Sequence, residues 1–570
     1  MNQNNENLNQ NQEQQTVQNV YSTPVQNIGQ NTINAQNSNN KGKVIFIIIA
    51  IVIVILGVCV STFFIINNKP KEEQTENEEE IINNKKYLTE YKMSSNSLEE
   101  FDLYFLKEEN EKTNKIYSPL SIKYALKMLE EGAGGNTKTQ LSTVLGDYVA
   151  KKYNNNANMS FANALFIRQS FSNSINEQYK QLLLNNYNAE VILDSFETPN
   201  NINNWISNKT FKLINNLVDD VSSNDFILIN ALAIDMEWQE KFLRSGEFGG
   251  YAHEQSDKED VWLGVPFVGE LWRRNFANVT NEISGMGIEA SINNYDVIKE
   301  IGEENIRKTV GDAYREYIKN DLNAFREYKN LDENFEITDE YIEEEIKNYL
   351  DHYIEEIGKN YHKNYRVTDF SLYTDENVKV FAKDLKEYDG TTLQYVGIMP
   401  VNEDLDEYVK NVKSSELNNI ISNLKGLKNE DFEEGIIVKI EGYIQKFKFE
   451  YELDLTGDLK KLGVTDVFDN EKADLSNLTA KKGSYIADTK HKANIEFTQD
   501  GIKAAAVTLA GGLGAGGYFD YHYEVPTKFI DLTFDKPYMF LIRDKKTGEI
   551  WFTGTVYEPL LWEEDATTGY

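Results

Sequence analysis

Residue types that carry chemistry are sparse in this sequence. There is one cysteine, Cys59, and the histidines are His253, His352, His362, His491 and His522. No two histidines have the HExxH spacing of a zinc protease, and neither a GxSxG nucleophile motif nor a P-loop is present. A single cysteine excludes an intramolecular disulfide and a cysteine-based zinc site. We therefore expect no catalytic residue, no metal and no cofactor, and infer that the protein is not an enzyme.

One glycine-rich stretch has the spelling of a dinucleotide-binding loop. KAAAVTLAGGLGAGGYFD, residues 503–520, contains Gly512-x-Gly514-x-x-Gly517. A true fingerprint follows a strand and opens a helix whose N-terminus binds the pyrophosphate. The residues after Gly517, YFDYHYEVP, alternate aromatic with polar types and end in proline, so they do not begin a helix. The small side chains instead suit a segment that must slide between close-packed strands.

The first 94 residues are predicted to carry a membrane anchor. Residues 1–43 form a disordered Asn/Gln-rich tail, 44–66 a transmembrane helix and 67–94 an acidic linker. The 23 uncharged residues Val44–Ile66 are long enough to cross a hydrocarbon core of roughly 30 Å. A signal peptide is the rival interpretation, but the apolar run is too long and lacks a small-x-small cleavage site. Lysines flank the span almost evenly, so they do not decide its orientation.

The remainder predicts a large α+β domain. SLEE, Ser97–Glu100, has the spacing of a capping box. A second helix is expected from Ser118 and Pro119 to Gly132. FILINALAIDMEW, residues 226–238, and several later runs have the composition of strands. Helices lead and strands dominate later, which is typical of the α+β class. The net charge of −34 argues against nucleic acid and heparin-like polyanions as partners.

An acidic helical block interrupts this domain at about 250–370. In the segment that starts at Thr338, one helix face carries a regular apolar stripe: Ile342, Ile346, Leu350, Ile354 and Ile357. NYDVIKEIGEENIRKTVGDAYREYI has a helical pattern as well. Nothing in these residues identifies a ligand or a partner.

Several motifs, in order, resemble the serpin family from about Ser97 to Pro559. They are NKIYSPLSIKYALKMLEEGAGGNTKTQL, INNWISNKTFKLINNLV, LINALAIDMEWQEKF, HKANIEFTQDGIKAAAVT, KPYMFLI and FTGTVYEP. The resemblance implies a fold with three β-sheets, eight to nine helices and an exposed reactive-centre loop. The serpin domain would span 95–560, with a C-terminal tail at 561–570 and the helical block as a large insertion.

The resemblance also implies a function. Serpins are suicide inhibitors of serine proteases and sometimes of cysteine proteases, and their cleaved loop inserts into the main sheet as a new strand. We therefore expect a single-pass, monomeric inhibitor with its serpin domain outside the cell and an extracellular protease as partner. The alternative is a non-inhibitory surface protein of the same fold that binds a partner through the helical block.

The serpin resemblance assigns roles to individual residues. The hinge comprises Gly501, Ile502, Ala504, Ala505, Ala506, Val507 and Thr508. Ile502 stands where inhibitory serpins usually have a smaller residue, but an apolar β-branched side chain can be buried in a strand. Counting by the family's usual spacing from Gln499 places the cleaved bond at Ala515–Gly516, which predicts an elastase-like or subtilisin-like target. Counting from the C-terminal side leaves other bonds open, and their residues, which would suit chymotrypsin-like targets, are Leu513, Tyr518, Phe519 and Tyr521.

Other positions match the regions where serpin strands part. The shutter maps to Ser118, Ser121, Asn230 and His491, and the breach to Trp238. Taken singly, each has an ordinary explanation, such as a helix cap or a buried aromatic residue. The resemblance instead predicts that they control the opening of the main sheet.

Overall fold

The structure is a computed structural model that describes residues 91, 93–242, 274–276, 282–360, 364–366, 369–487, 489–502, 519, 521, 523 and 525–561. All of them fall within one structural unit, Glu79–Tyr570. Within these ranges, no helix combines the length and apolar composition needed to cross a bilayer. The predicted tail, the span Val44–Ile66 and nearly all of the linker lie outside them, as does most of the predicted C-terminal tail.

Outside the helical block, the described residues form eight α-helices, as the serpin resemblance predicts. They are α3 (Glu100–Glu108), α4 (Pro119–Gly132), α5 (Gly135–Leu145), α6 (Glu177–Tyr187), α7 (Asn200–Lys209), α12 (Leu405–Asn411), α13 (Ser414–Ser422) and α14 (Leu455–Lys461). Short 3₁₀ helices are η1 (Gln169–Ser174), η2 (Asn429–Asp431) and η3 (Asp466–Phe468).

Local signals placed α4 correctly and α3 approximately. The Ser118 side chain caps α4 by accepting a hydrogen bond from the Ser121 backbone, and Pro119 occupies the first turn. For α3, the capping residue is Glu99 rather than Ser97. The Asp102 carboxylate accepts the Glu99 N–H at 2.8 Å, so the box forms two residues later than the SLEE pattern predicts.

The main sheet consists of two hydrogen-bonded parts. One has the order β3-β2-β4, and the other has the order β14-β15-β16-β5. Their bounds are β2 (Met159–Arg168), β3 (Glu190–Asp194), β4 (Phe226–Ile234), β5 (Met236–Glu237), β14 (Phe447–Asp454), β15 (Lys490–Phe497) and β16 (Gly501–Ile502). The predicted strand 226–238 is therefore divided between β4 and β5, which pair in different parts of the sheet.

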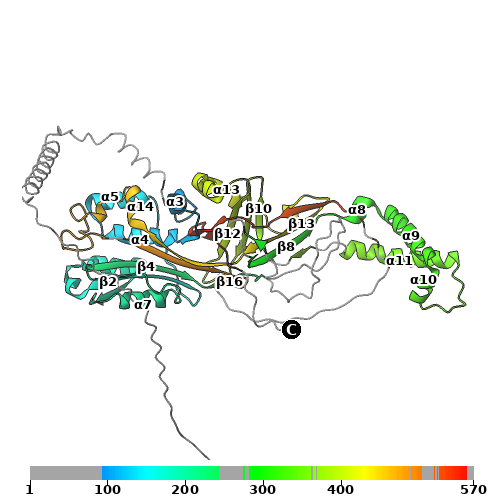
Figure 1. The fold of residues 1–570 in the computed structure, drawn as a ribbon, viewed down its shortest axis with the longest axis horizontal. Coiled ribbons are helices and arrows are strands. Elements are labelled where there is room, and N and C mark those ends of the chain that lie inside the picture. The colour runs from blue at the N-terminus through cyan, green and yellow to red at the C-terminus, as the bar shows by residue number, and fades with distance from the viewer. Residues whose placement is uncertain are drawn as a thin grey trace, which may run out of the picture. The chain divides into compact units, whose positions relative to one another are not determined.

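Two further sheets and a small ribbon complete the fold (Figure 1). The six-stranded sheet is β1 (Lys115–Tyr117), β19 (Ile550–Val556), β18 (Tyr538–Asp544), β12 (Leu393–Pro400), β11 (Val378–Asp384) and β10 (Ser371–Thr374). The four-stranded sheet is β17 (Thr527–Asp531), β13 (Ile437–Gln445), β8 (Gly285–Asn293) and β9 (Tyr365–Arg366), and the ribbon is β6 (Arg274–Asn275) with β7 (Glu282–Ile283). Helix α4 contacts both β4 and β19, so it joins the main sheet to the six-stranded sheet.

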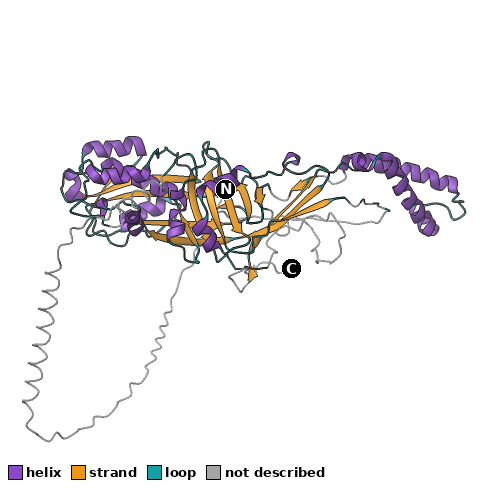
Figure 2. Ribbon diagram, turned by 90° about the horizontal axis from the view of Figure 1, so that it is seen from above, coloured by secondary structure: helices purple, strands orange, loops and turns teal. Residues whose placement is uncertain are grey.

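The helical block lies between β8 and β9, which pair with each other. It contains α8 (Val297–Ile301), α9 (Glu303–Asn320), α10 (Leu322–Tyr328) and α11 (Asp339–Asn360), and Figure 2 shows them apart from the other helices. The block has its own apolar core between α9 and α11. Ile342, Ile346, Leu350 and Ile357 of the predicted stripe are buried in it, and Ile354 is partly buried. The predicted helical pattern is confirmed in these four helices, but the predicted bounds of 250–370 also enclose the strands β6, β7, β8 and β9, so the helical block is shorter than expected.

Candidate functional site: a slot in the main sheet

A slot separates the two parts of the main sheet. Backbone pairing joins β4 to β2 and joins β15 to β14 and β16, so β4 and β15 are not partners. A cleft lies between them, and its lining includes Ala233, Ile234, Ile495 and Ile502. Backbone groups along strand edges require hydrogen-bond partners. The slot therefore has the chemistry to accept one more strand.

The first two residues of the predicted hinge already occupy one end of this slot. Ile502 pairs with Phe497 of β15 and with Met236 of β5. Gly501 approaches β5 so closely that a Cβ atom there would lie 2.3 Å from the Met236 carbonyl oxygen, so only glycine fits. The Ile502 side chain is only 3% exposed. Its bulk is therefore already accommodated in the intact protein.

The structure describes only two of the other residues predicted for the hinge and the cleaved bond. Those outside the described residues are Ala504, Ala505, Ala506, Val507, Thr508, Leu513, Ala515, Gly516 and Tyr518. Phe519 and Tyr521 are described, and both pack against the helical block.

Trp238 ties the end of the slot together, at the turn between β15 and β16. Its indole Nε1 donates to the Thr498 carbonyl at 2.8 Å. Its backbone N–H donates to the Asp500 carbonyl at 3.1 Å. The fully buried ring makes edge contacts with Phe497 and Tyr395. Trp238 is thus both a core aromatic residue and a structural link to the turn that precedes the hinge.

The four predicted shutter residues lie in one hydrogen-bonded chain. The Ser118 backbone N–H donates to His491 Nε2 at 2.9 Å. The Ser118 hydroxyl accepts from the Ser121 backbone at 3.0 Å, and the Ser121 hydroxyl donates to Asn230 Oδ1. His491 belongs to β15 and Asn230 to β4, so the N-terminus of α4 bridges the two sides of the slot.

Asn163 extends this chain, although the sequence analysis did not single it out. Its Oδ1 accepts from Asn230 Nδ2 at 2.8 Å, and its Nδ2 donates to the Tyr187 carbonyl at 2.9 Å. Asn163 is only 2% exposed in the middle of the apolar strand β2. A lone amide in such a strand is the signal that could have identified it, because buried polar groups need partners.

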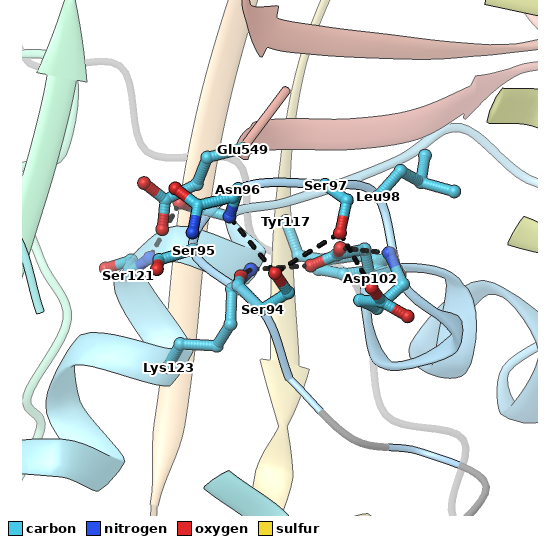
Figure 3. A network of polar contacts seen from close by, with 12 residues as sticks. Ser94, Ser95, Asn96, Ser97, Leu98, Asp102, Tyr117, Ser121, Lys123 and Glu549 are labelled. Atoms are coloured by element: carbon cyan, nitrogen blue, oxygen red, sulfur yellow. Dashed lines mark hydrogen bonds and ion pairs between the residues drawn. The ribbon is translucent and has the colours of Figure 1, made fainter. Parts of the chain in front are cut away.

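A buried ion pair holds α4 in position beneath the slot (Figure 3). Lys123 Nζ lies 2.9 Å from Asp102 Oδ1, and both side chains are fully buried. Lys123 also donates to the Ser94 carbonyl at 3.0 Å, and the Tyr117 hydroxyl donates to the Asp102 carbonyl at 2.7 Å. Removing one partner would leave an uncompensated buried charge. The contacts therefore fix α4 against α3 and the segment before it.

Burial of the His491 imidazole lowers its pKa to about 4. The ring is therefore neutral at pH 7, with Nε2 free to accept the Ser118 N–H. An unfolded histidine titrates near pH 6.5. Between pH 6.5 and 4 the unfolded chain binds the proton more readily, so stability must fall as the pH falls through this window.

We expect the variant His491→Gln to flatten this pH dependence. The free energy of unfolding, measured by denaturant titration, should fall less between pH 6.5 and 4 than in the wild type, because no imidazole titrates. His352→Gln is the matched control, since His352 is exposed on α11. An unchanged slope in His491→Gln would show that His491 does not govern acid stability.

Several known proteins are similar to this chain. A family model described as Serpin (serine protease inhibitor) matches residues 99–250 and 337–559. Serpin B10 of Mus musculus is 35% identical over 121 residues, which are 21% of this chain and 28% of that protein. Neuroserpin of Mus musculus is 24% identical over 473 residues, covering 79% and 87% of the two chains. Leukocyte elastase inhibitor A of Mus musculus is 29% identical over 173 residues, covering 30% and 42%.

A solved structure also matches. The thermophilic serpin tengpin in its native state has a TM-score of 0.51 and 21% identity, over 83% of this chain and 94% of that chain. At this identity the likeness supports the fold. The alignment with Serpin B10 spans less than a third of that protein's length. The family model leaves 251–336 unmatched, a range that contains α8, α9 and α10.

Proposed function

The chain belongs to the serpin family, and we propose that it inhibits proteases by inserting its cleaved loop into the slot between β4 and β15. One observation carries the proposal: Gly501 and Ile502 already pair as a short strand at the slot's end. Continuing that strand would give the facing edges of β4 and β15 the partners they lack. Relatives include a protein named as an elastase inhibitor.

In this proposal, the protease begins its ordinary reaction on the loop. Its serine hydroxyl attacks the carbonyl of the scissile bond, the following residue leaves as a protonated amine, and an ester joins loop to protease. Cleavage frees the segment that follows Ile502. About 15 residues inserting at roughly 3.3 Å each would carry the bound protease some 50 Å. The protease supplies the catalytic groups of this reaction.

The proposal includes a target and a location. Cleavage at Ala515–Gly516 would suit an elastase-like or subtilisin-like protease, whereas Leu513, Tyr518, Phe519 or Tyr521 would suit a chymotrypsin-like one. The span Val44–Ile66 would anchor a monomeric inhibitor at the cell surface, with the serpin domain outside.

The test is formation of a covalent complex. We expect the full-length chain, purified in mild detergent, to form a denaturant-resistant complex with pancreatic elastase or subtilisin on a gel. Mass spectrometry of the released peptide would locate the cleaved bond. A complex cut after Tyr518 or later would retain the mechanism and move the site. Cleavage by elastase, subtilisin and chymotrypsin without any complex would contradict inhibition and favour a non-inhibitory protein that binds through the helical block.

A further inference from the structure

The helical block holds residues that follow the hinge and precede β17. Phe519, Tyr521, Tyr523 and Val525 all pack against the core of the block. These residues are far from the block in sequence but adjacent to it in the fold. The block therefore has a defined occupant, which is part of this same chain.

Phe519 is the main apolar contact. Its ring stacks on Tyr314 with a centroid separation of 4.8 Å and an interplanar angle of 23°. The rings of Tyr317 and Tyr349 lie 5.2 Å and 5.6 Å away. Tyr314 and Tyr317 belong to α9, and Tyr349 belongs to α11. Aromatic pairs at these separations stabilise a contact beyond the area that they bury.

Two hydrogen bonds engage the backbone at the same place. The Tyr349 hydroxyl donates to the Phe519 carbonyl at 3.3 Å, and the Tyr353 hydroxyl donates to the Tyr521 carbonyl at 2.7 Å. Tyr353 is only 8% exposed, so its position is set by the core of the block. We call Tyr314, Tyr317, Tyr349 and Tyr353 the aromatic clamp.

The other end of this segment is held by the four-stranded sheet. The Ile437 backbone N–H donates to the Pro526 carbonyl at 2.8 Å, and β17 then pairs with β13 in parallel register. Phe519 and Tyr521 are therefore held by the block, and Pro526 is held by the sheet. A serine protease must bind the residue before the cleaved bond in two places. Its carbonyl oxygen enters the oxyanion hole, and its side chain enters the specificity pocket. The clamp already engages both carbonyls and the Phe519 ring, and the Tyr521 side chain packs against the core of the block.

We infer that the aromatic clamp is a specificity-determining element that protects the bonds after Phe519 and Tyr521 from chymotrypsin-like proteases. Attack is thereby directed to bonds on the N-terminal side of Phe519. The consequence for inhibition rests on the proposed function, but the protection itself does not. The clamp assigns a role to a block in which the family model leaves α8, α9 and α10 unmatched.

Limited proteolysis of the full-length protein with chymotrypsin tests this inference. The variants are Tyr317→Ala, which removes a half-exposed ring contact, and Tyr353→Phe, which removes only the hydroxyl. A double variant carries both substitutions. Mass spectrometry measures the rate of cleavage after Phe519 or Tyr521, and we expect this rate to be low in the wild type. It should become about 10-fold higher in the double variant, because an aromatic pair and a hydrogen bond together contribute roughly one decade.

Two further variants sharpen the result. Phe335→Ala is the matched control, because Phe335 is exposed and its ring contacts Tyr341 within the block. It should leave the rate unchanged. Phe519→Ala removes the anchor from the opposite side and should speed cleavage after Tyr521. Circular dichroism checks that the helices persist, and Tyr353→Phe alone remains informative if the ring variant unfolds.

The outcomes separate the clamp from the inhibitory mechanism. Wild-type protein cut after Phe519 or Tyr521 as fast as the double variant would overturn the clamp, even if elastase complexes still form. Protection of these bonds without any protease complex would retain the clamp and contradict the proposed function.

Discussion

Replacing Ile502 by arginine is expected to convert the protein from an inhibitor into a substrate. The Ile502 side chain is 3% exposed and lines the slot. Burying an unpaired guanidinium there costs several kcal/mol, so the hinge should leave the slot and insertion should slow. The acyl-enzyme would then hydrolyse first. We expect the fraction of protease trapped as a denaturant-resistant complex to fall at least about 10-fold, since each 1.4 kcal/mol is a decade.

Two controls accompany this variant. Ile502→Val keeps an apolar β-branched side chain and should form complexes nearly as well as the wild type. Val149→Arg makes a similar change of charge at a position that is 64% exposed, and it should have no effect. Gel quantification at several inhibitor-to-protease ratios measures how much of the protein forms the covalent complex and how much is released as cleaved chain. Complex formation by Ile502→Arg at the wild-type level would contradict insertion through this hinge.

Cleavage of the loop is expected to make the protein much more stable. Each inserted residue can form backbone hydrogen bonds with β4 and β15, and each such bond contributes about 1 kcal/mol. About 15 inserted residues would therefore add of the order of 15 kcal/mol, which raises the melting temperature by more than about 10 °C. Calorimetry before and after loop cleavage by a non-target protease measures the change.

A cut elsewhere provides the control. A site for a sequence-specific protease can be placed at the exposed turn between β11 and β12, near Asp389 and Gly390. Cleavage there should leave the melting temperature the same or lower it, because no strand is released beside the slot. A cleaved loop without added stability would identify a non-inhibitory serpin.

Local chemistry made several elements predictable. The ends of α4 could be predicted from Ser118, Pro119 and Gly132. Capping, a fixed φ and a helix stop all depend on neighbours in sequence. The apolar stripe of α11 was equally readable, because a helix with one buried face repeats at a known period. The roles predicted for Trp238 and the shutter residues depend on ordered family motifs, since their individual types are common in any core.

Contacts between distant parts of the chain were beyond such patterns. Asn163 escaped notice because its partners, Asn230 and the Tyr187 carbonyl, are chosen by strand register and helix packing. The aromatic clamp was equally invisible, although Phe519 and Tyr521 were noted as cleavage candidates. Tyr349 and Phe519 are separated by 170 positions, and only the fold makes them neighbours.

By itself, the sequence determined the α+β class, the family, and the main helices and strands. These follow from periodicity, capping and motif order, which act over short spans of chain. The tertiary structure decided that β4 and β15 do not pair with each other, that Ile502 already fills the end of their slot, and that the helical block holds Phe519. Each depends on which edges and faces meet after packing, and packing joins residues whose separation along the chain carries no local signal.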